Sequence, residues 1–63
     1  MYHYQIRLVP SSDKLLNSFI SFIADKDETA ISIAENVIDE LLSMTDMNEE
    51  FTIQIVSKFE VKL

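Results

Sequence analysis

The chain has 63 residues, 48% of them hydrophobic, and its 11 acidic and 5 basic side chains give a net charge of −6. This length predicts a single domain over residues 1–63, near the smallest size that one hydrophobic core can support. The absence of cysteine excludes disulfides and thiolate metal sites, and the acidic balance disfavours a partner that presents phosphates.

Hydropathy along the chain gives no sign of a membrane segment. No apolar run reaches the roughly 18 residues that a spanning helix needs, and the start lacks the layout of a signal peptide. We therefore expect a soluble, cytoplasmic protein that does not associate with membranes.

The N-terminal stretch YHYQIRLV, residues 2–9, alternates between two sets of side chains, which is typical of a half-buried β-strand. One side would carry Tyr2, Tyr4, Ile6 and Leu8, and the other His3, Gln5, Arg7 and Val9. Pro10 should end this strand, because proline cannot donate a ladder hydrogen bond.

The C-terminal stretch FTIQIVSKFEVKL, residues 51–63, alternates in the same way and predicts a second, longer strand. Its odd positions carry most of the apolar side chains. At about 3.3 Å per residue the first strand would span roughly 26 Å and the last roughly 43 Å.

Between these strands the apolar residues follow a helical period. They predict one amphipathic helix over residues 12–25 and a second that Asp27 caps and that extends to about Met44. The expected fold is therefore α+β: a small β-α-α-β unit with antiparallel strands packed on a helical hairpin.

The last strand is longer than its only expected partner within the chain, and a two-stranded sheet has two open edges. We therefore expect a homodimer in which a second copy extends the sheet. The apolar residues expected at this dimer or edge pairing are Phe51, Ile53, Ile55, Phe59 and Val61.

No constellation of residues predicts an active site, a metal site or a cofactor. His3 is the single imidazole, and Ser11 and Ser12 have no base nearby to activate them. The acidic run from Asp25 to Glu28 lacks the glycine-containing ligand series of a calcium loop and is better explained as a helix cap. We expect a protein that is not an enzyme.

The second helix carries an acidic face on the side away from its apolar residues, formed by Glu35, Asn36, Asp39 and Glu40. Glu35 and Asp39 are four residues apart, a spacing at which like charges cost a helix a few tenths of a kcal/mol. A basic surface on a protein partner would offset this repulsion.

The stretch HYQIRLVP at residues 3–10, followed by the expected helices, resembles the ribbon-helix-helix repressors over about residues 3–44. In that family the N-terminal strand pairs with its twin across a dimer, and alternate strand residues read the DNA major groove. The resemblance implies a DNA-reading role for His3, Gln5 and Arg7, with Thr29 near a phosphate at the second helix.

The sequence thus favours a small acidic binding protein that regulates or inhibits a larger protein partner, of the type that phages and mobile elements encode. A dimeric DNA-binding repressor of the ribbon-helix-helix kind is the alternative. A small structural subunit of an assembly is a further alternative.

Overall fold

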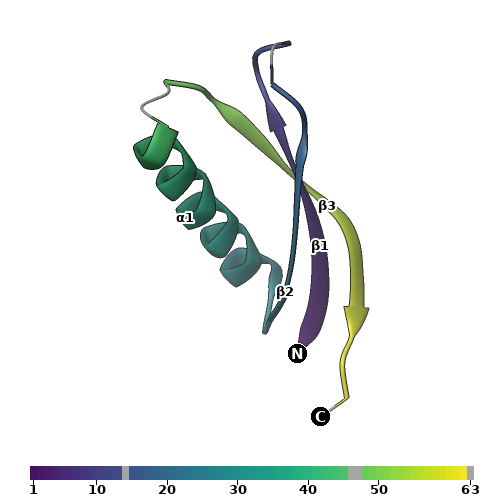
Figure 1. Cartoon of the computed structure of the whole chain (residues 1–63). Coiled ribbons are helices and arrows are strands. Elements are labelled where there is room, and N and C mark those ends of the chain that lie inside the picture. The colour runs from purple at the N-terminus through teal and green to yellow at the C-terminus, as the bar shows by residue number, and fades with distance from the viewer. Residues whose placement is uncertain (14, 46–47, 63) are drawn as a thin grey trace.

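The computed structural model describes residues 1–13, 15–45 and 48–62. These residues form three strands and one helix in the order β1 (Tyr2–Pro10), β2 (Ser18–Ala24), α1 (Asp27–Thr45) and β3 (Phe51–Glu60). The strands make one antiparallel sheet with the order β2-β1-β3, and α1 lies against one face of it (Figure 1). The expected α+β class is confirmed at this level.

β1 is the central strand, so both of its hydrogen-bonding edges are occupied. It pairs antiparallel with β2 from Tyr2 opposite Ala24, and with β3 from Tyr2 opposite Glu60. The antiparallel pairing expected between the two terminal strands is therefore confirmed. The ribbon-helix-helix resemblance implies that this strand pairs with the same strand of a second copy. β1 has no free edge for such pairing.

The expected helix over residues 12–25 is wrong, because Ser18–Ala24 forms strand β2 instead. The segment SFISFIA carries bulky aromatic and β-branched side chains, which favour a strand. Phe19 and Ile23 lie on the face of the sheet away from α1, whereas Ile20 and Phe22 pack against the core. Because β2 has apolar residues on both faces, its sequence pattern resembles that of a helix with a broad apolar side. Lys14, which the expected helix included, lies outside the described residues.

The last strand is also shorter than expected, since β3 ends at Glu60 and its predicted end at Leu63 lies outside the described residues. A β-bulge shifts the register between Gln5 and Ile6, where Val56 is the extra residue of β3. Nine residues of β1 therefore accompany the ten of β3. The excess of strand length from which we expected a homodimer is therefore absent, and the homodimer stays a prediction.

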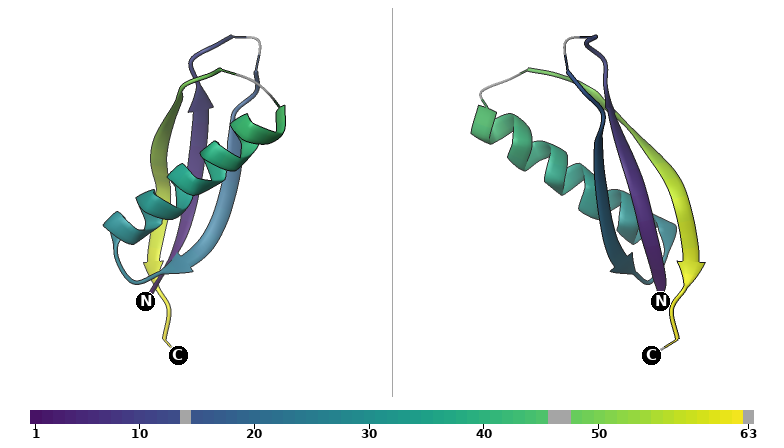
Figure 2. Two further views of the ribbon diagram at one scale, coloured as in Figure 1. Left: turned by 90° about the vertical axis from the view of Figure 1, so that its left-hand side faces the viewer. Right: turned by 45° about the vertical axis from the view of Figure 1, so that its right-hand side comes forward.

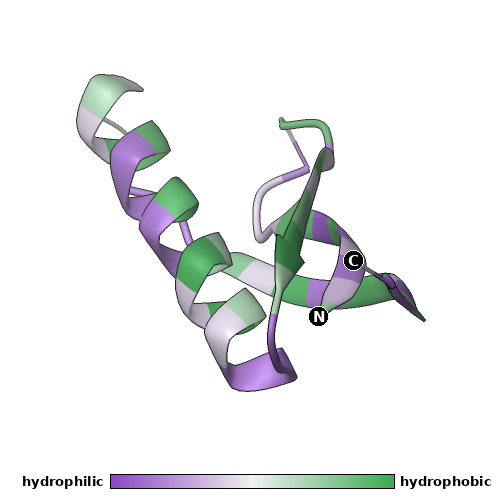
Figure 3. Cartoon of the chain, turned by 90° about the horizontal axis from the view of Figure 1, so that it is seen from below, coloured by the Kyte–Doolittle hydropathy of each residue, from purple (hydrophilic) through white to green (hydrophobic). Residues whose placement is uncertain are grey.

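α1 crosses the sheet obliquely, with its N-terminal end near β3 and its C-terminal end on the side of β2 (Figure 2). The hydrophobic side of the helix faces the sheet, and its hydrophilic side faces outward (Figure 3). At the C-terminal end an apolar groove of about 170 Å³ remains between the two layers. Its lining is Leu15, Leu16, Ser18, Leu41, Leu42, Thr45 and Phe51.

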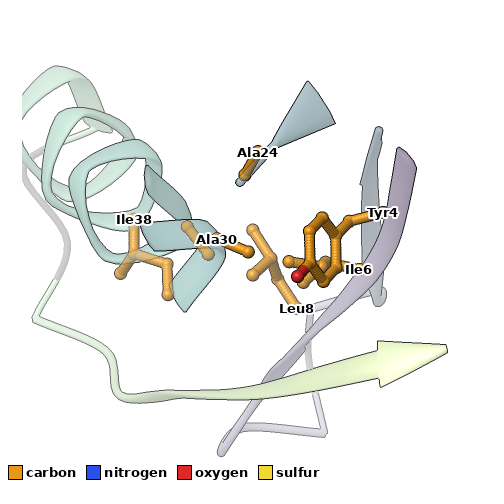
Figure 4. Packing of buried hydrophobic residues seen from close by; sticks show 7 residues of the cluster. Tyr4, Ile6, Leu8, Ala24, Ala30 and Ile38 are labelled. Carbon is orange, nitrogen blue, oxygen red and sulfur yellow. The ribbon is translucent and has the colours of Figure 1, made fainter. Parts of the chain in front are cut away.

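The core is small and centres on the inward side chains of β1 (Figure 4). Its buried members are Tyr4, Ile6, Leu8, Ala24, Ala30, Ala34 and Ile38. The alanines of α1 allow the helix backbone to approach the sheet closely, so the large side chains come mainly from β1. Most of the stabilising burial therefore depends on one strand.

This arrangement predicts unequal effects for two isoleucines that face each other across β1 and β3. Ile6 is fully buried, whereas Ile55 on the outer strand is 38% exposed. Ile6→Ala should lower the free energy of unfolding by about 2–5 kcal/mol, a large part of the roughly 3–9 kcal/mol typical for this length. Ile55→Ala should cost about 1 kcal/mol or less. Urea denaturation measures both, and equal losses would contradict the central position of β1.

Candidate functional site

The outer side of α1 carries an exposed acidic face. Ala30, Ala34 and Ile38 face the sheet, and this leaves the four residues of the acidic helix face exposed: Glu35, Asn36, Asp39 and Glu40. The sequence-based placement of these side chains on one outward face is therefore found in the structure. No lysine, arginine or histidine occurs within Asp27–Thr45, so nothing on the helix itself neutralises them.

Within the described residues, ion pairs form only at the N-terminal end of α1. Lys58 pairs with Asp27 at 2.8 Å, and Lys26 lies 3.7 Å from Glu28. None of the described cations forms an ion pair with an acid of the acidic helix face. The negative potential of α1 is consequently strongest over its C-terminal two-thirds.

A cluster that the sequence did not reveal joins α1 to the sheet, and we call it the N-terminal clamp: Tyr4, Asp27 and Lys58. The Tyr4 hydroxyl donates to Asp27 Oδ1 at 2.7 Å, and Lys58 Nζ contacts the same oxygen at 2.8 Å. Lys58 Nζ also lies 4.3 Å from the centre of the Tyr2 ring, in cation–π geometry. Three elements, β1, α1 and β3, meet at this one carboxylate.

Each group of the N-terminal clamp has a shifted pKa. The hydrogen bond from the Lys58 ammonium, aided by that from Tyr4, lowers the pKa of Asp27. The same bond to Asp27 raises the pKa of Lys58. Burial, and secondarily the bond to Asp27, raises the pKa of Tyr4. The charges of Asp27 and Lys58 and the neutral Tyr4 hydroxyl therefore stabilise one another between acidic and strongly alkaline pH.

The β-bulge explains why the sequence pattern missed this cluster. Without it, Lys58 would fall on the face of β3 away from α1, because Phe51 and Ile53 pack on the α1 side and Lys58 is an odd number of residues beyond both. The extra residue Val56 inverts the alternation, so Lys58 pairs with Tyr4 and points towards the helix. The adjacent apolar pair Ile55 and Val56 is the only local signal of such an irregularity.

No described element covers the sheet face opposite α1, and we call it the open sheet face. Strand register arranges it in three rows across β2, β1 and β3: Ile23–His3–Phe59, Ser21–Gln5–Ser57 and Phe19–Arg7–Gln54. The His3 ring stacks on Phe59 with centres 4.9 Å apart, and the Arg7 guanidinium lies 5.5 Å from the centre of Phe19. His3, Gln5 and Arg7, which the resemblance marks as DNA-reading residues, thus share this face.

The remaining sequence-predicted residues do not form one site. Phe51 and Ile53 pack against the core beneath α1, whereas Phe59 lies on the open sheet face beyond the bulge. The structure therefore divides these residues between the two faces of the sheet, and their expected role in dimer or edge pairing stays a prediction. Val61 follows β3, with its N–H donating to the Met1 carbonyl at 3.0 Å. Thr29 in the first turn of α1 hydrogen-bonds the Asp25 carboxylate and lowers the pKa of that group.

No protein-family model, curated protein or solved structure matches the chain. Among the described residues, no group of three or more His, Cys, Asp or Glu is arranged to hold a metal ion. No helix in the described part of the chain is both long enough and apolar enough to cross a membrane.

The N-terminal clamp predicts a specific pH dependence of stability. Because the pKa of Asp27 is lowered on folding, its contribution is present above the usual carboxyl pKa of 3.8 and is lost as the pH falls below it. Asp27→Asn should lower the melting temperature at neutral pH and weaken its decline in acid. Melting curves from pH 7 to strongly acidic pH, followed by circular dichroism, measure this.

Glu28→Gln is the matched control, since Glu28 is the next residue of the same helical turn and its side chain is 86% exposed. It should leave both the melting temperature and its acid dependence close to those of the wild type. Equal behaviour of the two variants would show that the clamp does not hold α1 to the sheet.

Proposed function

We propose that this protein is a small non-enzymatic binding protein that attaches to a basic surface of a larger protein through the acidic helix face. Binding there would regulate or inhibit the partner by covering a basic site, such as a groove that receives nucleic acid. The observation that carries the proposal is that Glu35, Asp39 and Glu40 are exposed on a packed helix, without an ion-pair partner among the described residues.

The position of these acids is unfavourable for the isolated helix. Glu35 and Asp39 repel each other at a spacing of four residues. Asp39 and Glu40 lie one to two turns before the C-terminal end of α1, whose last turn carries no basic residue, so the helix leaves their charge unbalanced. A basic partner would offset both costs, which are small individually.

The charge of the whole chain supports the same kind of partner. With a net charge of −6, the protein attracts a basic surface over a distance of about one Debye length, roughly 8 Å at physiological salt. Such attraction raises the association rate more than it slows dissociation. Binding through the acidic helix face should therefore be fast and sensitive to salt.

The DNA-binding alternative has weaker support. His3, Gln5 and Arg7 do share the open sheet face, but Arg7 is the one lysine or arginine in its three rows. A phosphate backbone is normally held by several cations, and the net charge of the chain opposes it. The central place of β1 also leaves no edge for the ribbon of that family.

The test replaces Glu35, Asp39 and Glu40 together by lysine and measures binding to lysine- and arginine-rich peptides by calorimetry at low and physiological salt. We expect at least about a tenfold loss of affinity, or about 1.4 kcal/mol, and a flatter salt dependence. The melting temperature should stay constant or rise, because lysine suits the C-terminal end of a helix.

The matched control changes the net charge by the same amount away from α1, by lysine substitution of Asp13, Glu50 and Glu60, which are all exposed. It should retain most of the binding at physiological salt, where distant charges are screened. If both triple variants lose affinity equally, the chain binds through its overall charge and the acidic helix face is not the site.

A further inference from the structure

The open sheet face carries four large apolar side chains that are well exposed. The exposed fractions are 65% for Phe19, 53% for Phe59, 48% for Val56 and 45% for Ile23. No acidic side chain belongs to the three rows of this face, although the chain as a whole has 11 acids. Exposed aromatic residues with arginine and few acids are typical of the centre of a protein–protein interface.

The chain also exposes more surface than its size predicts for an independent domain. Its accessible area is 4674 Å², whereas a compact protein of 7.3 kDa is expected to expose about 4,200 Å². The radius of gyration is 12.4 Å, against about 10.6 Å for a compact chain of this length. One helix covers one face of the sheet, and no other element of the described ranges forms a layer on the opposite face.

We propose that a second copy of this chain covers the open sheet face, so that two sheets stack face to face about a two-fold axis. The proposal concerns a different surface from the acidic helix face and does not depend on the basic partner. Stacked sheets lie about 10 Å apart with their side chains interleaved. The two α1 helices would then form the outer layers of a four-layer dimer.

The three rows of the open sheet face are complementary to themselves under a two-fold axis that runs across the strands. The row Phe19–Arg7–Gln54 would lie opposite the row Ile23–His3–Phe59 of the other copy. Phe19 would then meet Ile23 of the other copy, and Arg7 would meet His3 and not a second Arg7. The middle row would face itself, with the Gln5 amides of the two copies able to hydrogen-bond.

The surface shape of the open sheet face is compatible with this arrangement. Ser21 and Ser57 on either side of Gln5 are small, so the middle row lies lower than the two outer rows. A hollow at this level is lined by Gln5, Phe19, Ile20, Ser21 and Val56. An apolar side chain from the opposite copy can enter it.

The distribution of charge favours a second copy over other occupants. Face-to-face stacking would keep the two acidic helix faces on opposite outer surfaces, roughly 30 Å apart, a distance at which their repulsion is screened. A basic partner would meet no carboxylate in the three rows of the open sheet face. A nucleic acid would meet only one lysine or arginine in these rows, Arg7. The apolar residues provide the main attraction.

Edge-to-edge pairing through β3 is disfavoured by the strand itself. The bulge at Val56 interrupts the regular ladder, and Lys58 and Glu60 place charges near the edge, which are devices that block the addition of another strand. The footprint of the open sheet face is roughly 14 by 23 Å, smaller than a standard interface, so we expect a weak and reversible dimer.

The test is sedimentation equilibrium of the wild type and of the Phe19→Thr/Phe59→Thr variant over a range of concentrations. The wild type should approach twice 7.3 kDa, whereas the variant should remain at 7.3 kDa. Threonine keeps a high strand propensity, and both phenylalanines are exposed in the single chain, so the variant should stay folded. Leu16→Thr is the control, because Leu16 is 90% exposed but lies outside the sheet.

A second measurement uses the wild type alone and needs no substitution. A soluble paramagnetic agent broadens the NMR signals of exposed methyl groups. On raising the protein concentration, the methyls of Ile23 and Val56 should become protected, while those of Leu16 and Met44 remain accessible. The dimer should also persist at high salt, unlike binding through the acidic helix face.

Three results would overturn the proposal. One is a wild type that stays monomeric at millimolar concentration. Another is a double variant that dimerises as tightly as the wild type, as an edge-paired dimer would. The third is protection of Ile23 and Val56 only when single-stranded nucleic acid is added. None of these results bears on whether α1 binds a basic protein, so the two proposals can fail separately.

Discussion

β1 pairs along both of its edges and packs one of its faces beneath α1, and the other elements are arranged around these contacts. Its inward side chains Tyr4, Ile6 and Leu8 are fully buried beneath α1. Its two edges are filled by strands that arrive by different routes, β2 through the connection at residues 11–17 and β3 only after the helix. Because β2 and β3 lie on opposite sides of β1, the helix between them must cross the whole sheet.

The crossing leaves the helix unevenly attached. At its N-terminal end the clamp and the alanines bring α1 close to the sheet, while at its C-terminal end an apolar groove separates the layers. The acids of the acidic helix face are thereby displayed on a helix that is fixed near its beginning. The opposite surface of the molecule has a different chemistry, with exposed phenylalanines and no carboxylate in its three rows.

These two surfaces could operate together. A face-to-face dimer would present two acidic helices pointing in opposite directions, so it could engage two basic surfaces but could not place both helices on one flat patch. Bivalent binding gains affinity only when the geometry allows both contacts. A dimer of this form would therefore bridge two separate partners and would not bind a single partner more tightly.

The sequence allowed the terminal strands, their antiparallel pairing and the outward acidic face of α1 to be predicted, because each follows from a regular alternation or period. β2 could not be recognised in this way, since Phe19 and Ile23 are apolar on a face that the chain itself leaves uncovered. The N-terminal clamp was hidden for another reason. Tyr4 and Asp27 are 23 residues apart, and their contact with Lys58 depends on a change of strand phase that side-chain pattern does not encode.

The bulge at Val56 also determines which kinds of mutation the chain can tolerate. Substitutions in the following segment alter one side chain at a time and leave the orientation of the others unchanged. Deletion of Val56 would remove the bulge and restore strict alternation, yet the residues beyond it would keep their partners on β1. Lys58 would still face α1 opposite Tyr4, and Phe59 would still face away from the helix opposite His3. In evolutionary terms, the bulge is the place in β3 where the chain should tolerate the loss of one residue.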